Sequence, residues 1–227
     1  GVFGILMSRY SNADDSLFST IYNGRNDSRL ENTVCMLVKT LPVYCRFEQK
    51  TTIQAYMTEL SGQLLSSMAN DIFPFSDICA KYGFNSDLTF AYQAELSDDY
   101  PIGDTVARGH DLSLDIAKMP LLIQVREYNN EYVLTAEFRS DMYSDAFVDG
   151  MLDAYEAAMD SVLKNKYVSE VSIISENAVK KIAEFNDTAC EYDRAKTISD
   201  RFAEMVQTIP DHTAVVFKDK KFTYKEL

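Results

Sequence analysis

The sequence is short of basic residues. It has 22 lysines and arginines against 35 aspartates and glutamates, which gives a formal net charge of -13 at pH 7. Binding nucleic acid without sequence preference requires a basic surface that displaces counterions from phosphates. The charge balance therefore excludes a nucleic-acid-binding role of that kind, and it identifies no other partner.

Long hydrophobic runs are also absent. No apolar run approaches the ~18 residues that a membrane-spanning helix requires. The N-terminus has neither the basic start nor the cleavage site of a secretory signal peptide. We therefore expect a soluble, cytoplasmic chain that does not bind a membrane.

Residues that commonly bind metals or carry out catalysis are few. The four cysteines have no Cys-x-x-Cys spacing, and three lie in apolar surroundings, so we predict reduced thiols in the core: Cys35, Cys45, Cys79 and Cys190. The only histidines are His110, which a neighbouring Asp111 could orient or which is simply a solvated loop residue, and His212, in a turn. The sequence has no Gly-rich phosphate loop, His-Glu-x-x-His or Gly-x-Ser-x-Gly. These motifs thus predict no metal or cofactor site.

The most informative stretch that is present runs over residues 34–47. Its first five residues are all apolar, which predicts a fully buried segment. After Lys39 and Thr40, apolar residues alternate with others, as in a half-buried strand. Pro42 has no backbone N–H, so it must lie at an edge, at a bulge or at the start of the strand. A polar pair in such a run is expected to face a cavity or a partner.

The remaining patterns predict an α/β fold in which a sheet packs against amphipathic helices. Residues 1–10 resemble the end of a buried helix, so we expect the chain to be part of something longer. Helical spacing over residues 51–70 and 144–164, with Thr51 and Ser144 as caps, predicts two amphipathic helices, and Ser76 is expected to cap a short one. Strands are predicted at residues 17–22, 88–93, 121–127 and 132–138. The weakly patterned connection 97–118 is expected to be functional or to cross between elements.

The character of the chain changes after residue 168. A short helix over residues 175–185 is followed by a polar stretch, 186–196, where we place the domain boundary. Thr197 then caps another helix, and residues 214–217 and 222–224 are predicted to form a hairpin. About thirty residues cannot bury a core of their own.

Taken in order, these segments resemble the condensation domain of nonribosomal peptide synthetases. The resemblance lies in Phe18-Ser19-Thr20, Asn23-Gly24-Arg25, Leu37-Val38-Lys39-Thr40-Leu41-Pro42, Phe73-Pro74-Phe75, and Asn85 with residues 88–93. Asn186-Asp187-Thr188, residues 210–216 and Phe222-Thr223-Tyr224-Lys225-Glu226-Leu227 are similar to the linker and first core motif of an adenylation domain. The resemblance implies a C-terminal part of a condensation domain at 1–175, an interdomain linker at 176–196 and a truncated start of an adenylation domain at 197–227.

This resemblance implies a chloramphenicol acetyltransferase-like lobe on the acceptor side of a tunnel. The family joins carrier-tethered aminoacyl or peptidyl thioesters, so the implied partners are the N-terminal lobe, peptidyl carrier domains bearing phosphopantetheine, and the downstream adenylation domain. No cofactor or metal is implied for this chain itself. Lys39, Thr40 and Asn85 would border the tunnel, and Gly24 and Arg25 would shape a neighbouring turn. For Lys39, a side chain that extends to solvent from a strand end is the alternative.

The sequence also departs from the family pattern. Lys39 stands where the family has Asn, Ser76 where it has Glu, and Ser86-Asp87 where Pro is expected. The family's His-His-x-x-x-Asp-Gly motif does not occur. We therefore expect this chain to have no turnover alone and assign it no catalytic residue. The alternatives are a catalytically inactive, condensation-like platform that docks carrier or partner proteins, or an epimerization or heterocyclization relative.

Overall fold

The computed structural model describes all residues except 26, 49, 86, 95–98, 109–115 and 129–130. The chain divides into two compact units, Gly1–Ile182 and Ala183–Leu227. The first unit holds helices α1 (Val2–Ser11), α2 (Ile53–Ala69), α3 (Phe75–Tyr82) and α4 (Asp145–Lys164), and strands β1 (Asp15–Tyr22), β2 (Lys39–Arg46), β3 (Leu88–Gln93), β4 (Asp99–Ile102), β5 (Thr105–Arg108), β6 (Leu121–Tyr128) and β7 (Glu131–Phe138). Helix α5 (Glu176–Asn186) extends across the boundary between the units.

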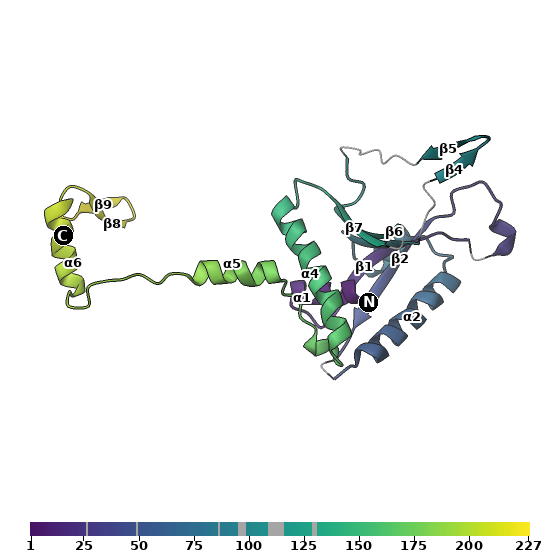
Figure 1. Cartoon of the computed structure of the whole chain (residues 1–227), viewed down its shortest axis with the longest axis horizontal. Helices are drawn as coiled ribbons and strands as arrows, with labels where there is room; N and C mark the ends of the chain where they lie inside the picture. The colour runs from purple at the N-terminus through teal and green to yellow at the C-terminus, as the bar shows by residue number, and fades with distance from the viewer. Residues whose placement is uncertain (26, 49, 86, 95–98, 109–115, 129–130) are drawn as a thin grey trace. The chain divides into compact units, whose positions relative to one another are not determined.

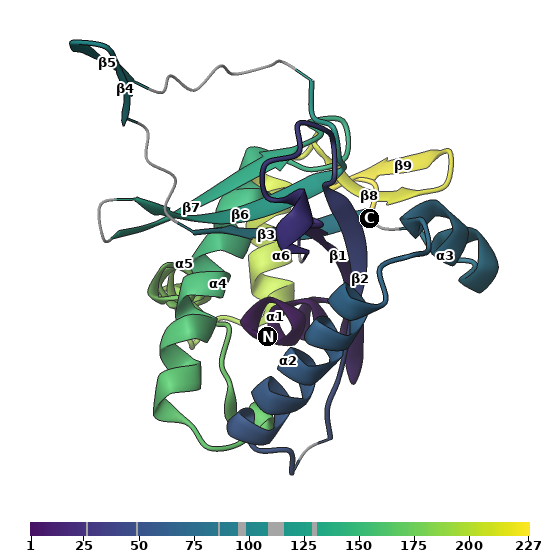
Figure 2. The same ribbon diagram turned by 90° about the vertical axis from the view of Figure 1, so that its right-hand side faces the viewer.

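The main sheet of the first unit is mixed. Figure 1 shows the whole chain, and the view of Figure 2 labels the strands of this sheet, whose order is β2-β1-β3-β6-β7. Strand β1 pairs antiparallel with β2 and parallel with β3, β3 pairs parallel with β6, and β6 and β7 form an antiparallel hairpin. Because β2 is an edge strand, Pro42 can sit within it without breaking the ladder. The predicted α/β class with a mixed sheet is confirmed.

Helices α1, α2 and α4 cover one face of this sheet (Figure 2). Helix α1 is apolar on nearly all sides, and its Phe3, Ile5 and Leu6 are fully buried, as expected for a helix in the centre of a core. The ring of Phe3 lies 4.9 Å from that of Phe18 and 5.1 Å from that of Phe90. These aromatic contacts join α1 to β1 and β3, so the predicted buried helix is the element on which the sheet packs.

The helix boundaries follow from their capping residues. Ser144 caps α4 as predicted, because its hydroxyl oxygen accepts a hydrogen bond from the backbone N–H of Phe147. For α2 the predicted cap was wrong by one residue: the hydroxyl of Thr52 accepts from Ala55, whereas that of Thr51 accepts from Glu48. Ser76 caps nothing. It lies inside α3, whose N-cap is Pro74.

One further prediction for the first unit was wrong. Residues 34–38 are mostly exposed rather than buried: Val34 and Met36 have relative exposures of 102% and 86%. The cause is that β2 begins only at Lys39, so the preceding residues have no strand partner. The connection 97–118 also holds a short antiparallel hairpin, β4–β5, which the sequence pattern did not indicate. His110 lies outside the described residues.

The cysteines correct a further expectation. Only Cys45 is a core thiol; Cys35 and Cys190 are exposed and Cys79 is half-buried. Burial raises the pKa of Cys45, and its neighbours Tyr56 and Ser16 offset this only in part. A thiol with a raised pKa is a poor nucleophile, so Cys45 acts as a small apolar residue.

The second unit contains α6 (Ile198–Thr208) and the hairpin β8 (Thr213–Phe217) and β9 (Lys220–Thr223). Thr197 caps α6 as predicted, and Asp200 completes a reciprocal capping box. The Thr197 backbone N–H and hydroxyl donate to Asp200 and lower the pKa of its carboxyl. The ring of Phe202 lies 5.5 Å from that of Tyr224, which packs α6 against the end of the hairpin. Among the described helices of both units, none has the length and hydropathy to cross a bilayer.

Candidate functional site

The sequence-predicted site residues Lys39 and Thr40 line a hollow of about 300 Å³ at the start of β2. Its walls are residues 38–41, residues 71–74 of the connection between α2 and α3, and Phe75 at the start of α3. Sequence positions some thirty residues apart therefore meet here, and the Phe73-Pro74-Phe75 segment forms one wall. We call this the β2 hollow.

An ion pair closes one side of the β2 hollow. The Lys39 ammonium lies 2.9 Å from a carboxylate oxygen of Asp71 and donates a second 2.9 Å bond to the Asp71 backbone carbonyl. The Lys39 and Asp71 side chains are 40% and 21% exposed, so solvent weakens the attraction to about 1 kcal/mol at most. The side chain is thus tied to the α2–α3 connection rather than extended into solvent.

Tyr22 stands beside this ion pair. It faces Lys39 across the β1–β2 ladder, so the two side chains share one face of the sheet. Burial and the negative charge of Asp71 raise the pKa of Tyr22, and the positive charge of Lys39 opposes them. Within the described part of the chain, the buried Tyr22 hydroxyl has no hydrogen-bond partner. Tyr22 itself does not line the β2 hollow.

Gly24 and Arg25 hold the loop that leads into β2. Gly24 has φ +67°, and a Cβ added to it would lie 2.0 Å from the carbonyl oxygen of Leu37, so glycine is required on both counts. The Arg25 guanidinium donates to the carbonyls of Leu30, Thr33 and Cys35 at 2.6, 2.9 and 3.2 Å. Gly24 therefore packs against Leu37 at the end of this loop, and Arg25 holds the backbone of residues 30–35 within it.

The structure does not bring all five predicted residues to one wall. Consecutive residues of a strand project from opposite faces. Lys39 shares the helix-covered face with Leu41 and Val43, whereas the Thr40 side chain shares the other face with Pro42. Asn85 is exposed just before β3 and does not line the β2 hollow.

Sequence reasoning missed Asp71 and Tyr22. The signal for Tyr22 was available, because pairing the two predicted strands places it opposite Lys39. Nothing local could have indicated Asp71, which is 32 residues from its partner. An ion pair between residues so far apart in sequence produces no helix or strand periodicity by which it could be predicted.

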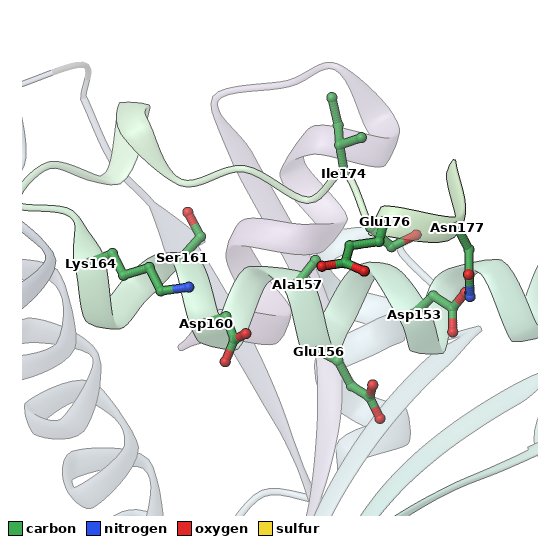
Figure 3. A pocket seen from close by; sticks show the side chains of 10 residues that line it. Asp153, Glu156, Ala157, Asp160, Ser161, Lys164, Ile174, Glu176 and Asn177 are labelled. Atoms are coloured by element: carbon green, nitrogen blue, oxygen red, sulfur yellow. The ribbon is translucent and has the colours of Figure 1, made fainter. Parts of the chain in front are cut away.

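A second hollow, of about 510 Å³, lies where α4 faces residues 174–177 (Figure 3). Its polar lining includes Asp153, Asp160, Glu176 and Lys164, and the Asn177 amide donates to Asp153 at 2.9 Å. No predicted site residue lies here. Among the described residues, no group of three or more His, Cys, Asp or Glu side chains could hold a metal ion.

The lining of the β2 hollow has no serine, cysteine or histidine, and its Lys39 is held in an ion pair with Asp71. The geometry supports positioning of a reactant against the wall that Lys39 and Asp71 fix.

The sheet order and the one-sided helical cover define a fold shared with solved condensation-domain proteins. The crystal structure of a holo four-domain nonribosomal peptide synthetase bound to AMP and glycine matches with a TM-score of 0.73 at 15% identity, covering 99% of this chain and 19% of that chain. A complex of the X-domain and OxyB from teicoplanin biosynthesis matches with a TM-score of 0.61 at 13% identity, covering 77% and 41%. The predicted fold is confirmed.

A family model described as Condensation domain matches residues 1–183, and the chain belongs to that family. Gramicidin S synthase 2 of Brevibacillus brevis is 28% identical over 236 residues, which cover 99% of this chain and 5% of the synthase. The chain thus spans about a twentieth of the length of this relative.

Proposed function

We propose that the chain is the acceptor-side lobe of a condensation domain that forms peptide bonds in a nonribosomal peptide synthetase. The observation that carries the proposal is the family match over residues 1–183. The alignment of 99% of the chain with an antibiotic synthetase supports it. The substrates would be aminoacyl or peptidyl thioesters tethered to phosphopantetheine arms of peptidyl carrier domains.

The domain organisation is part of the same proposal. Residues 1–175 would be the C-terminal part of the condensation domain, 176–196 an interdomain linker, and 197–227 the start of an adenylation domain. The adenylation-like motif at residues 222–227 supports this division. The match of a four-domain synthetase to 99% of the chain is consistent with it. The implied partners are the N-terminal lobe, the carrier domains and the adenylation domain.

The lobe would act by positioning rather than by donating or removing protons. In this proposal the β2 hollow borders the acceptor tunnel, with Lys39 held in its wall by Asp71. Excluding solvent there would favour aminolysis of the thioester over hydrolysis. Thr40, on the opposite face of β2 from Lys39, and Asn85, just before β3, would also border the tunnel.

An assay of the isolated chain tests whether one lobe suffices. Donor and acceptor thioesters on carrier domains are mixed with the chain, and the dipeptidyl product is measured by mass spectrometry. We expect no product above the background without protein. Product formation by the chain alone would overturn the assignment to a single lobe.

Substitutions in the complete synthetase test the β2 hollow. Lys39→Met removes the ammonium while keeping a long apolar side chain, and we expect the condensation rate to fall by about 10-fold, the effect of about 1.4 kcal/mol at the transition state. Lys39→Asn restores the residue that the family pattern has at this position and asks whether the departure is functional. Lys81→Met on the exposed surface of α3 is the control. Equal rates for Lys39→Met and the control would exclude a tunnel role for Lys39.

A second candidate function is a catalytically inactive platform that docks a carrier or partner protein. The match to an X-domain solved in complex with OxyB favours it. An intact His-His-x-x-x-Asp-Gly motif in the parent protein, with condensation lost on its substitution, would support the enzyme. A degraded motif with retained carrier binding would support the platform. Epimerization or heterocyclization by the parent protein would appear in the same assay as a changed product.

A further inference from the structure

An apolar hollow of about 700 Å³ lies between strands β3, β6 and β7 and the second half of α4. Its volume falls within the range of small-molecule sites, ~300–1,000 Å³. Four of its nine lining residues are aromatic: Phe90 and Tyr92 come from β3, Tyr132 from β7 and Tyr155 from α4. It shares no residue with the β2 hollow. We call it the α4 hollow.

The aromatic rings form both the floor and the mouth of the α4 hollow. At the floor, the rings of Phe90 and Tyr155 lie 5.9 Å apart, tilted by 45°. At the mouth, Tyr92 and Tyr132 are 53% and 68% exposed. Such rings bury an apolar body, and their electron-rich faces attract cations. The lining therefore suits a ligand that combines an apolar part with a positive charge.

Two carboxylates supply negative charge at the same place. Glu156 and Asp160 are four residues apart on α4, and both line the α4 hollow. Figure 3 shows the Glu156 side chain pointing away from residues 174–177. Across the described ranges, neither carboxylate has a hydrogen-bond or ion-pair partner. Glu156 and Asp160 also line the hollow of Figure 3 together with Lys164, whereas Lys164 does not line the α4 hollow.

We propose that the α4 hollow binds small organic ammonium compounds, in which a primary amine is attached to an apolar chain or ring. The apolar part packs among Phe90, Tyr155 and Met159, and the ammonium lies near Glu156 and Asp160 and the faces of the outer tyrosines. A neutral analogue keeps only the apolar contacts, and an anionic one is repelled by the carboxylates. This site is separate from the β2 hollow and does not depend on the proposed condensation function.

Three probes of the same length test the charge preference. The full chain is titrated at pH 7 with 4-phenylbutylammonium, 4-phenylbutanol and 4-phenylbutyrate by isothermal calorimetry. We expect 4-phenylbutylammonium to bind about 10-fold more tightly than 4-phenylbutanol, from two exposed charge contacts and the ring faces. We expect 4-phenylbutyrate to bind more weakly than either. Equal affinity for the ammonium and the alcohol overturns the proposal.

Two readouts locate the binding. The methyl resonance of Met159, assigned with Met159→Leu, is expected to shift on addition of 4-phenylbutylammonium; an unshifted resonance places binding elsewhere and overturns the proposal. Glu156→Gln combined with Asp160→Asn should lower the affinity for the ammonium to that for the alcohol. The control, Asp153→Asn combined with Glu176→Gln, makes the same charge change in the hollow of Figure 3 and should leave the affinity unchanged. Equal losses in the two double variants would also overturn the proposal, since they would indicate only a general effect of charge.

Discussion

At the scale of single residues, the loop before β2 depends on one glycine. In Gly24→Ala the alanine would need a left-handed backbone, and its Cβ would lie 2.0 Å from the Leu37 carbonyl oxygen. The backbone at one of these two residues must therefore move. We expect the free energy of unfolding to fall by about 2 kcal/mol or more, because the left-handed conformation alone costs an L-residue ~1–2 kcal/mol. The measurement is urea denaturation followed by circular dichroism.

The matched control is Gly83→Ala. Gly83 also has a positive φ, +69°, but a Cβ added there would meet nothing within 4 Å, so only the conformational cost of about 1 kcal/mol applies. A loss at Gly24 no larger than that at Gly83 would show that the contact with Leu37 is not required for stability.

A pair of tyrosines provides a second prediction at this scale. The buried Tyr22 hydroxyl has no partner within the described residues, whereas that of Tyr56 donates to the Gly1 carbonyl at 3.0 Å. Tyr22→Phe should therefore leave the free energy of unfolding unchanged or raise it by up to about 1 kcal/mol, and Tyr56→Phe should lower it by about 1 kcal/mol. Thermal unfolding of the two variants makes the comparison. Equal destabilisation would mean that Tyr22 has a hydrogen-bond partner after all.

At the scale of elements, two serines can be compared: Ser144, which caps α4, and Ser76, which was predicted to cap α3 but lies inside it. Ser144→Ala should lower the free energy of unfolding by about 1 kcal/mol, because the Phe147 backbone N–H loses the side-chain acceptor of the cap and keeps only the Ser144 carbonyl. Ser76→Ala should change it by no more than a few tenths, since Ser76 caps no helix. Chemical denaturation measures both variants. A loss for Ser76→Ala equal to that for Ser144→Ala would contradict the assigned start of α3.

The elements also show how far the sequence predicts the fold. Strand β3 was predicted over the same residues that it occupies, because its alternation has the period of a strand and its partners on both sides are strands too. Residues 34–38 have equally strong apolar character but no partner strand, and local composition cannot reveal that. The β4–β5 hairpin was missed because its few residues carry no clear apolar alternation.

For the candidate site, the sequence predicted positions but not contacts. Gly24 and Arg25 were expected to shape a turn, and both hold the loop before β2. The roles of Lys39, Thr40 and Asn85 in a tunnel remain predictions. The partner of Lys39 could not be foreseen, because the contact with Asp71 requires the end of α2 to reach the edge of the sheet.

At the scale of the whole molecule, the exposed stretch between α5 and α6 predicts where proteases cut. Residues 187–196 lie in neither helix nor strand, and Arg194 and Lys196 are exposed. Brief trypsin digestion should cleave first after these two residues, because cleavage requires an extended, unpaired backbone. Mass spectrometry identifies the fragments.

Lys166 provides the internal comparison. It is also exposed, but its carbonyl accepts from the Ile53 N–H and its own N–H donates to Glu170. We expect cleavage there only after the cuts near residue 194. Early cleavage at Lys166 would indicate that the segment after α4 is not held against α2.

The parallel pairing of β1 with β3 and of β3 with β6 has a consequence for the kinetics of folding. Ser19 can pair with Thr89 only after the intervening chain, which includes α2 and α3, has been synthesised. In the same way, Leu88 can pair with Leu121 only after the residues between them have been made. Joining strands so distant in sequence requires long loops to close before any pairing energy is gained, which slows folding. During translation, the β1–β2 hairpin would therefore form early and keep the inner edge of β1 open until β3 leaves the ribosome.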